Sequence, residues 1–275
     1  MTRIAVIVAA GGNGSRMGGA VPKQFMPLAG RPVLMRTVER LAEALPGARI
    51  VVVLPAAQTG RWEELQRKYG FTVEHTLVEG GADRFHSVLA ALDACGDCDL
   101  IAVHDGVRPL TSADMIRRVV AEAERSGAAV PAVTPVDSFR LIDAVEGCRP
   151  TGGTGGPGAE SVPARVEAKR LAGRSPQPSP AESETSTPLD RERLRAVQTP
   201  QVFHAGLLRD AYRDAAAQIG ATAAAGAEAG KLFTDDATVV ERAGHTVRLC
   251  PGDRRNIKIT TGTDMAIAEA LIKYE

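Results

Sequence analysis

The sequence of 275 residues lacks long apolar runs, and this absence excludes several classes of protein. A membrane-spanning helix needs about 20 consecutive apolar residues, and no run here approaches that length. The N-terminus carries one arginine, Arg3, followed by a short apolar run that leads into glycines, which is not the pattern of a signal peptide. We therefore expect a cytoplasmic protein that does not bind a membrane.

An excess of charge of either sign is also absent. The 33 lysines and arginines balance the 33 aspartates and glutamates, so the formal net charge is zero. A chain without net charge has no global attraction to nucleic acid, and we expect no nucleic-acid partner. An anionic ligand would have to be bound by local clusters of arginine and lysine.

Cysteine is scarce, and the four cysteines are Cys95, Cys98, Cys148 and Cys250. Four scattered cysteines are too few for a disulfide framework. Cys95 and Cys98 form a CxxC pair, which could be half of a zinc site or a redox pair. No second pair of ligands with a suitable spacing is present, so we interpret these residues as incidental thiols.

The sequence does contain an alternation of predicted strands and helices. Short apolar runs rich in β-branched residues are typical of buried parallel strands, and apolar residues at helical spacing indicate the helices between them. The predicted strands are residues 4–9, 50–54, 72–77, 100–103 and 128–133. The predicted helices are residues 32–45, 87–94, 112–126 and 263–273. This order predicts an α/β fold whose mostly parallel sheet is covered by helices on both faces.

Two later segments have a different composition. Residues 146–188 are rich in proline, glycine and serine and contain no aromatic residue. Such a segment cannot bury enough apolar surface to offset its ordering entropy, so we expect it to be largely disordered, with a short helix possible at residues 165–171. For the alanine-rich residues 215–230 we expect a helix that ends in a flexible loop.

In parallel α/β sheets, ligands bind beyond the carboxyl ends of the strands. A glycine-rich segment, Ala9-Ala-Gly-Gly-Asn-Gly-Ser-Arg-Met17, follows the first predicted strand. Its glycines allow backbone N–H groups to approach a phosphate, and Arg16 and Lys23 add two cations. The spacing fits neither the dinucleotide fingerprint nor the P-loop. The alternative is a tight turn with solvent-facing cations.

A second motif, Val103-His-Asp-Gly-Val-Arg-Pro109, comes at the end of the fourth predicted strand. The carboxylate of Asp105 suits Mg²⁺, which prefers oxygen ligands, and Arg108 could contact a phosphate. Alternatively, Asp105 caps the turn or pairs with Arg108. We interpret His104 as a structural residue of the core.

Two further motifs carry cations. Gly80-Gly-Ala-Asp-Arg-Phe-His-Ser87 offers backbone groups, Arg84 and a hydroxyl to a ligand, although Asp83 could simply cap a helix there. In Arg254-Arg-Asn-Ile-Lys-Ile-Thr260, the lysine alternates with two isoleucines and so points to the opposite face of any strand formed there. An edge-strand lysine that faces water is the alternative.

Together, these motifs in this order resemble the 2-C-methyl-D-erythritol 4-phosphate cytidylyltransferase family of isoprenoid precursor biosynthesis. The resemblance runs from Ile4 to the C-terminal helix and omits only residues 146–188. It also rests on four more motifs, which are Pro22-Lys23-Gln24, Asp190-Arg191, Thr199-Pro-Gln201 and Thr234-Asp-Asp-Ala237.

The resemblance implies a single nucleotidyltransferase domain over residues 1–275, with a Rossmann-like sheet and a protruding dimerisation arm at residues 136–196. It implies a homodimer that uses CTP, a polyol phosphate and Mg²⁺ or another divalent cation. A phosphate oxygen of the polyol phosphate would attack the α-phosphorus of CTP, and pyrophosphate would leave. Residues 146–188 fall within the arm, and we expect them to form an excursion at its tip.

The resemblance also assigns roles to residues of this sequence. The implied catalytic residues are Arg16, Lys23 and Lys258. The implied substrate-binding residues are Ala10, Gly11, Gly12, Gly81, Ala82, Arg84, Ser87, Asp105, Arg108, Ser138 and Arg191, and Asp105 is also the implied metal ligand. Ser138 stands where threonine is common in the family, and Ala9 stands where proline is common. A cytidylyltransferase for another polyol phosphate, such as ribitol 5-phosphate, and a non-catalytic nucleotide-binding protein are the alternatives.

Overall fold

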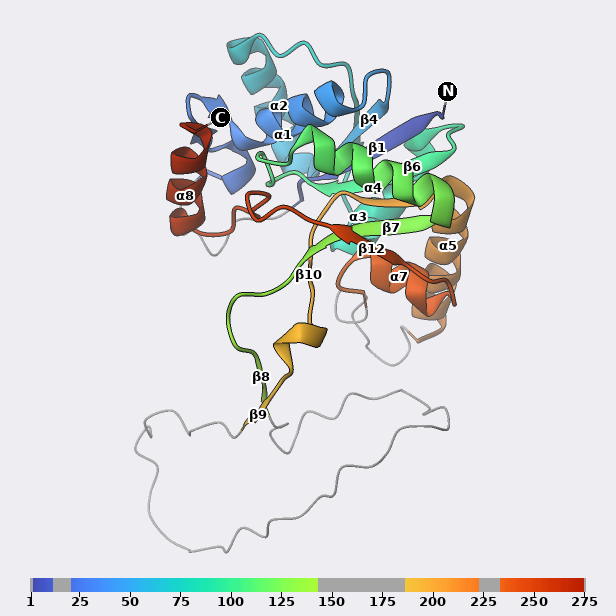
Figure 1. Cartoon of the computed structure of the whole chain (residues 1–275). Helices are drawn as coiled ribbons and strands as arrows, with labels where there is room; N and C mark the ends of the chain where they lie inside the picture. Colours follow the sequence, from blue (N-terminus) through green and yellow to red (C-terminus); the bar gives the residue numbers. More distant parts are fainter. Residues whose placement is uncertain (1, 12–20, 143–185, 223–232, 275) are drawn as a thin grey trace, which may run out of the picture. The chain divides into compact units, whose positions relative to one another are not determined.

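The computed structural model describes residues 2–11, 21–142, 186–222 and 233–274, and Figure 1 shows the course of the chain. The strands are β1 (Ile4–Ala9), β2 (Pro27–Leu28), β3 (Arg31–Pro32), β4 (Arg49–Leu54), β5 (Thr76–Glu79), β6 (Leu100–Asp105), β7 (Ala128–Val133), β8 (Arg140–Ile142), β9 (Ser186–Pro188), β10 (Ala196–Val197), β11 (Gln201–His204) and β12 (Arg248–Pro251). The α-helices are α1 (Val33–Ala44), α2 (Ala56–Tyr69), α3 (Arg84–Ala91), α4 (Ala113–Ser126), α5 (Ala205–Thr222), α7 (Asp236–Arg242) and α8 (Gly262–Ile272). Short 3₁₀ helices are η2 (Lys23–Phe25), η3 (Asp93–Cys95) and η4 (Arg191–Arg193).

The chain divides into two compact units. The larger unit comprises Met1–Val133 and Arg195–Glu275, and the smaller unit comprises Thr134–Leu194. In the smaller unit, β8 and β9 form an antiparallel pair in which Arg140 lies opposite Pro188. No helix in the described ranges is long and apolar enough to cross a membrane.

The larger unit is built on a mixed, mostly parallel sheet, which confirms the predicted α/β fold. Eight strands of the described chain form it, in the order β10-β7-β11-β6-β1-β4-β5, with β12 beside β7. The strands β6, β1, β4 and β5 are parallel to one another, whereas β11 lies antiparallel between β6 and β7. The parallel part therefore brings the ends of β1 and β6 to the same edge.

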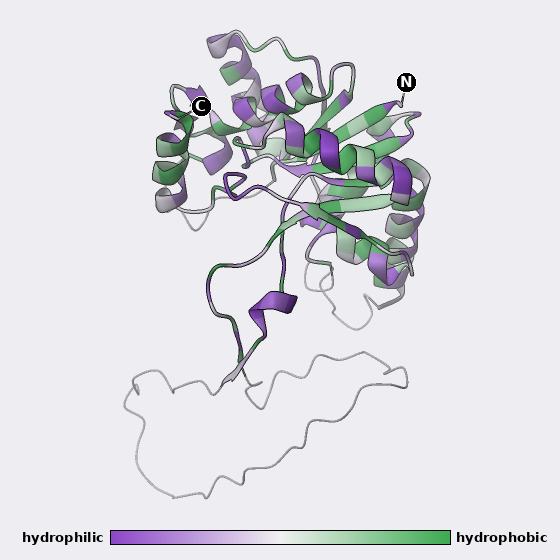
Figure 2. Cartoon of the chain, viewed as in Figure 1, coloured by the Kyte–Doolittle hydropathy of each residue, from purple (hydrophilic) through white to green (hydrophobic). Residues whose placement is uncertain are grey.

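Each central strand is buried on both faces. In β1, Ala5 and Ile7 face one side and Val6 and Val8 face the other, and all four are fully buried. Helices α3, α5 and α7 cover the first face, and α1, α2 and α4 cover the second. Figure 2 shows the result, because the strands of the sheet are mainly green whereas the helices mix green and purple. Burial on both faces explains why these strands read as continuous apolar runs.

Helix ends follow from local capping groups. The Ser112 side chain accepts a hydrogen bond from Met115 N at the start of α4, and Gly127 ends that helix in the left-handed region with φ 86°. The predicted helix at residues 112–126 is thereby confirmed. Helix α3 begins at Arg84, three residues before the prediction, because Asp83 caps it by accepting from His86 N.

Three local predictions differ from the structure. The sequence predicts no element at α2, because its apolar face is narrow: only Trp62 is buried, and Leu65 and Tyr69 pack against the core while partly exposed. The third strand was predicted at residues 72–77, but β5 lies at Thr76–Glu79, because Phe71 and Val73 alternate while they pack against the core outside the sheet. The last three residues of the segment predicted to be disordered form β9.

Other predictions fall outside the described residues. The short helix at residues 165–171 and nearly all of the segment 146–188 lie there, as do residues 223–230 after α5. The predicted C-terminal helix at residues 263–273 is confirmed as α8, one residue earlier. A hydrogen-bonded capping box of Thr261 and Asp264 opens it.

Candidate active site

A cavity of about 350 Å³ lies at the carboxyl ends of β1 and β6. The last residues of these strands, Ala9 and Asp105, are direct neighbours in the sheet. Many predicted site residues line this cavity, namely Ala10, Gly11, Lys23, Gly81, Ala82, Arg84, Ser87, Asp105 and Lys258. The edge of the sheet has therefore brought together four motifs that are far apart in the sequence.

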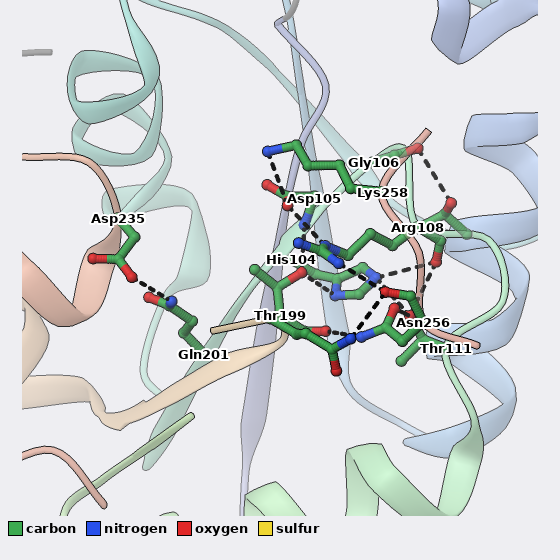
Figure 3. Close-up of polar contacts among 12 residues, drawn as sticks. His104, Asp105, Gly106, Arg108, Thr111, Thr199, Gln201, Asp235, Asn256 and Lys258 are labelled. Atoms are coloured by element: carbon green, nitrogen blue, oxygen red, sulfur yellow. Dashed lines mark hydrogen bonds and ion pairs between the residues drawn. The ribbon is translucent and has the colours of Figure 1, made fainter. Parts of the chain in front are cut away.

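Asp105 is the carboxylate at the centre of this site, and it is only 6% exposed. Its Oδ2 accepts from Arg108 Nε at 2.9 Å and lies 3.2 Å from Lys258 Nζ, and Figure 3 shows both contacts. Its Oδ1 lies 3.9 Å from Arg84 Nε. Burial alone would raise the pKa of Asp105, but Lys258, Arg84 and Arg108 outweigh it and hold the pKa well below its usual range. Arg84 is also paired with Asp236, but Lys258, Arg108 and the cavity-lining Lys23 still leave a local excess of positive charge, which suits an anionic ligand.

Arg84 is held in place by Asp236, a residue far from it in the sequence. Its Nη1 and Nη2 donate to Asp236 Oδ1 and Oδ2 at 2.8 and 2.6 Å. The Asp236 side chain is fully buried, and Tyr212 OH also donates to it at 2.6 Å. Because the fork of Arg84 is occupied by Asp236, its Nε side faces Asp105. The only sequence signal for Asp236 was its place in the Thr234-Asp-Asp-Ala237 motif.

Arg108 is not among the residues that line the cavity. It lies behind Asp105, where Nε donates to that carboxylate and Nη1 donates to Asn256 O at 2.8 Å. The alternative of an Asp105–Arg108 pair is therefore what the structure contains. Arg108 joins the end of β6 to the segment that carries Lys258, and its contact with substrate stays a prediction.

Lys258 belongs to an irregular segment rather than to a strand. The predicted alternation nevertheless holds, because Ile257 and Ile259 pack into a small core with α8 and the β2–β3 hairpin. The Ile259 N–H donates to Val107 O at 2.9 Å. With both neighbours anchored in this way, the Lys258 side chain faces Asp105 and the cavity, where Thr260 also lies.

Close backbone approaches shape the turns around the cavity. A Cβ at Gly81 would lie 2.4 Å from His86 Cβ, and a Cβ at Gly106 would lie 2.8 Å from Ala10 Cβ. Only glycine fits at these positions. Asp83 lines the cavity, and its side chain caps α3, as the alternative for this motif stated. The binding role of the motif stays a prediction.

Gln24 ties the Lys23 segment to the turn after β1. Its Nε2 donates to Ala10 O at 2.9 Å and to Gln58 Oε1 at 2.7 Å, and the residue is 1% exposed. Gln24 lines the cavity beside Lys23. The only signal for Gln24 in the sequence is its place in the Pro22-Lys23-Gln24 motif. Of the other predicted residues, Gly12 and Arg16 lie outside the described residues.

Comparison with known proteins decides which family this site belongs to. The family model of 2-C-methyl-D-erythritol 4-phosphate cytidylyltransferase matches residues 4–151 and 180–274. The chain belongs to this family. Proteins of that name from Phocaeicola vulgatus and Bacteroides thetaiotaomicron are 37% and 38% identical to it over 267 and 268 residues, and each alignment covers 97% of this chain and 98% of the relative. The predicted resemblance is thereby confirmed.

Solved structures agree with this assignment. The 2-C-methyl-D-erythritol 4-phosphate cytidylyltransferase of Thermus thermophilus is 28% identical, with a TM-score of 0.63 over 98% of this chain and 99% of that chain. The 4-diphosphocytidyl-2C-methyl-D-erythritol synthase of Anaerococcus prevotii has a TM-score of 0.69 at 22% identity, over 99% of this chain and 96% of that chain, which supports the fold.

In this cytidylyltransferase family member, Ser138 and Arg191 lie in the smaller unit. Both are exposed, and Arg191 Nη1 donates to Val136 O at 3.0 Å. This bond links the two chain segments that lead into β8 and out of β9. The roles predicted for Ser138 and Arg191 stay predictions.

The family member offers few metal ligands of its own. No group of three or more His, Cys, Asp or Glu residues that could hold a metal occurs in the part of the chain that the structure describes. At the cavity, Asp105 already faces three cations, so a divalent ion would depend mainly on ligand phosphates and water. Cys95 and Cys98 are buried free thiols, and burial raises the pKa of Cys95 to about 12. This agrees with their interpretation as incidental thiols.

His104 lies directly before Asp105 and is fully buried. Burial lowers the pKa of His104 to about 4, with Arg108 and Lys258 acting in the same direction and Asp105 against it. The imidazole is therefore uncharged near neutral pH. The structural interpretation of His104 agrees with its burial and with its hydrogen bonds to Thr111 and Thr199.

Proposed function

We propose that the protein transfers the cytidylyl group of CTP to 2-C-methyl-D-erythritol 4-phosphate and releases pyrophosphate, a step of isoprenoid precursor synthesis. The observation that carries this proposal is a cavity lined by Lys23, Arg84 and Lys258 together with the buried carboxylate of Asp105, in a chain of this family. A phosphate oxygen of the polyol phosphate attacks the α-phosphorus. The bond from that phosphorus to the oxygen of the β-phosphate breaks, and pyrophosphate leaves.

Charge stabilisation is the main task of such a site. Negative charge develops on the oxygens of the α-phosphate and on the leaving pyrophosphate, so fixed cations lower the barrier more than a proton carrier would. Lys23 and Lys258 come from different segments and line the same cavity, as this task requires. Arg16 is proposed as a third cation on the strength of the family resemblance.

Recognition of cytosine is proposed to use the turns after β1 and before α3. Ser87 Oγ donates its proton to Asp83 O at 2.7 Å, so it offers only lone pairs to a ligand. An acceptor suits the exocyclic amino group of cytosine, where uracil presents a carbonyl. The backbone of Ala10, Gly11, Gly81 and Ala82 lines the same cavity and supplies the remaining donors and acceptors. We therefore expect CTP to be preferred over UTP.

A divalent cation, for which Mg²⁺ is the natural choice, is proposed to enter with the triphosphate. When bound, it would neutralise phosphate charge, with Asp105 as the protein carboxylate within the cavity that is best placed to contact it or its water. Chelation of divalent ions should abolish turnover and leave the protein folded.

The smaller unit is proposed to be the dimerisation arm. Five large apolar side chains are exposed on it, namely Val136, Phe139, Leu141, Ile142 and Leu189. Exposed apolar side chains grouped on a small unit indicate a surface that a partner covers. We propose that a second copy of this cytoplasmic protein covers it, which would place Ser138 and Arg191 at the partner's substrate site.

The test is pyrophosphate release from CTP with a divalent ion, measured with 2-C-methyl-D-erythritol 4-phosphate and, separately, with ribitol 5-phosphate. We expect release with the first acceptor and not with the second, and slower release when UTP replaces CTP. Release with ribitol 5-phosphate alone would keep the chemistry and refute the substrate. If folded protein released no pyrophosphate with either acceptor, the proposed function would be refuted.

A further inference from the structure

The buried His104 lies between two hydroxyl groups, as Figure 3 shows. Its Nδ1 is 2.9 Å from Thr199 Oγ1, and its Nε2 is 3.2 Å from Thr111 Oγ1. Neither of these threonines lines the cavity, and His104 does not line it either. The imidazole is therefore placed to act on the site through its neighbours.

The protons of the two hydroxyl groups determine the tautomer of His104. Asp105 N donates to Thr199 Oγ1 at 3.1 Å, so the proton of this hydroxyl is available to His104 Nδ1. Thr111 Oγ1 donates to Asn256 Oδ1 at 2.7 Å. Nε2 therefore faces a hydroxyl that has already given its proton away, with Arg108 O at 3.5 Å as its other neighbour. Both neighbours can only accept, so the hydrogen is on Nε2.

Asn256 closes these bonds into a ring. Its Nδ2 donates to Thr199 O at 2.8 Å, which fixes the orientation of the amide and leaves Oδ1 for Thr111. Four residues, Thr199, His104, Thr111 and Asn256, thus form a ring. The Thr111 hydroxyl also lies 3.0 Å from Arg108 O, and either acceptor takes its proton away from His104 Nε2. We call them the His104 ring.

The His104 ring is linked to the segments that carry Asp105 and Lys258, and its members do not line the cavity. Asp105 enters it through its own N–H, and Lys258 follows Asn256 by two residues. Arg108 adds a second link, because it donates to both Asp105 and Asn256 O. The ring therefore connects the end of β6, the residues before β11 and the segment that carries the lysine.

We propose that His104, as its Nε2–H tautomer, is a positioning residue. Through the His104 ring it holds the backbone at Asp105 and the segment that carries Lys258 in a fixed relative position. This inference rests on the proposed cytidylyl transfer. The closed ring ties the backbone at Asp105 to the segment that carries Lys258, so the starting points of the two side chains are fixed relative to one another before ligand binds. Such preorganisation affects the chemical step more than the binding of nucleotide.

Two variants of Thr111 test this positioning role. Thr111→Val removes the hydroxyl with little change in shape, leaving His104 Nε2–H and Asn256 Oδ1 without their partner. We expect kcat to fall about 10- to 100-fold, with KM for CTP nearly unchanged. Thr111→Ser keeps the hydroxyl and should retain most of the wild-type kcat. Wild-type kcat in a folded Thr111→Val protein would overturn the proposal.

Thr238→Val is the matched control. Thr238 Oγ1 donates to Asp235 Oδ1 at 2.6 Å in α7, so the same substitution removes a hydroxyl hydrogen bond outside the ring and the cavity. We expect normal kcat for this control. Thermal unfolding of all three variants separates a loss of folded protein from a loss of catalytic geometry. An equal loss of kcat in Thr238→Val would show that any lost hydroxyl has this effect, and would overturn the positioning role.

The tautomer can be measured without activity. We expect nitrogen-15 NMR of histidine-labelled protein, assigned through the backbone, to show a protonated Nε2 and an unprotonated Nδ1 for His104. A protonated Nδ1 would refute the ring. Because this spectrum needs no turnover, an inactive wild-type protein with the expected tautomer would refute the proposed function and leave the ring standing.

Discussion

Two regions of this molecule differ in opposite ways from the usual distribution of side chains, because one buries polar groups and the other exposes apolar ones. At the end of β6, the charged Asp105 and Arg108 and the polar His104 are buried, and each has several partners. In the smaller unit, Phe139, Leu141 and Ile142 are exposed. Buried charge is stable only when it is paired, and exposed apolar surface is normally covered by a partner. The polar groups of the first region thus find their partners within one chain, whereas for the second region we propose a second copy of the protein as the partner.

The largest effect that we expect is on catalysis, from Lys258→Ala. Removing this cation takes a fixed charge from the site of the proposed transfer, and we expect kcat to fall about 100- to 1,000-fold. Steady-state kinetics with both substrates measures it. Lys273→Ala, at the exposed end of α8, is the control and should leave kcat unchanged. Normal turnover by Lys258→Ala would remove this residue from the proposed mechanism.

Asp236→Asn should show how strongly the buried charges depend on their partners. The change leaves Arg84 without its charged partner, and breaking a buried pair costs about 3 kcal/mol of unfolding free energy. Chemical denaturation measures this loss. Asp235→Asn is the matched control, because asparagine also caps helices well and the cost should be small. Equal losses for the two variants would contradict the special place of Asp236.

The double change Leu141→Ser and Ile142→Ser should have the opposite effect to Asp236→Asn, because it should weaken self-association and leave the unfolding free energy nearly unchanged. Since both side chains are about half exposed, at 58% and 46%, we expect the unfolding free energy to change by less than about 0.5 kcal/mol. Self-association should weaken about 10- to 100-fold, as expected when one or two apolar contacts are lost from an interface. Sedimentation over a range of concentrations measures it. Unchanged association would refute the proposed dimer surface.

The smallest effect concerns the start of α8, which anchors the Lys258 segment. Burial would raise the pKa of Asp264, but hydrogen bonds from Thr260 and Thr261 lower it overall. A lowered pKa in the folded state gives stability that is present above the unfolded pKa of about 3.9 and is lost as the pH falls through the folded pKa. The melting temperature of Asp264→Asn should therefore lie below that of the wild type at neutral pH, and the two should converge in acid. A difference that grows in acid would contradict this.

The sequence predicts the central sheet well because its strands are buried on both faces. Strands β1 and β7 have the predicted bounds, Ile4–Ala9 and Ala128–Val133, because a strand with no solvent-exposed face has a continuous apolar sequence. Helix α2 is harder to predict in the same way, because Trp62 is its one buried residue and only Leu65 and Tyr69 extend that apolar face. Strand β9 could not be predicted either, because its three residues are the last three of the low-complexity segment at residues 146–188.

For the site, the sequence indicates which residues carry chemistry but not what holds them. Asp105, Lys23 and Lys258 stand out because charged residues follow apolar strands or alternate with apolar residues. Asp236 is 152 residues from Arg84, and Asn256 is 145 residues from Thr111, so no local pattern connects them. Arg108 is predicted to contact ligand from its charge alone, and only the fold shows that it lies behind Asp105. Roles that depend on long-range contacts could not be predicted from local sequence.

The central claim is that this site joins an acceptor phosphate to the α-phosphorus of CTP. The most direct test uses CTP labelled with oxygen-18 on the non-bridging oxygens of the α-phosphate, incubated with 2-C-methyl-D-erythritol 4-phosphate and Mg²⁺. Mass spectrometry of the products then follows the label. The account predicts that all of the label enters a cytidine diphosphate ester of methylerythritol and that none enters pyrophosphate. Label in the pyrophosphate, or no diphosphate ester from folded protein, would contradict it.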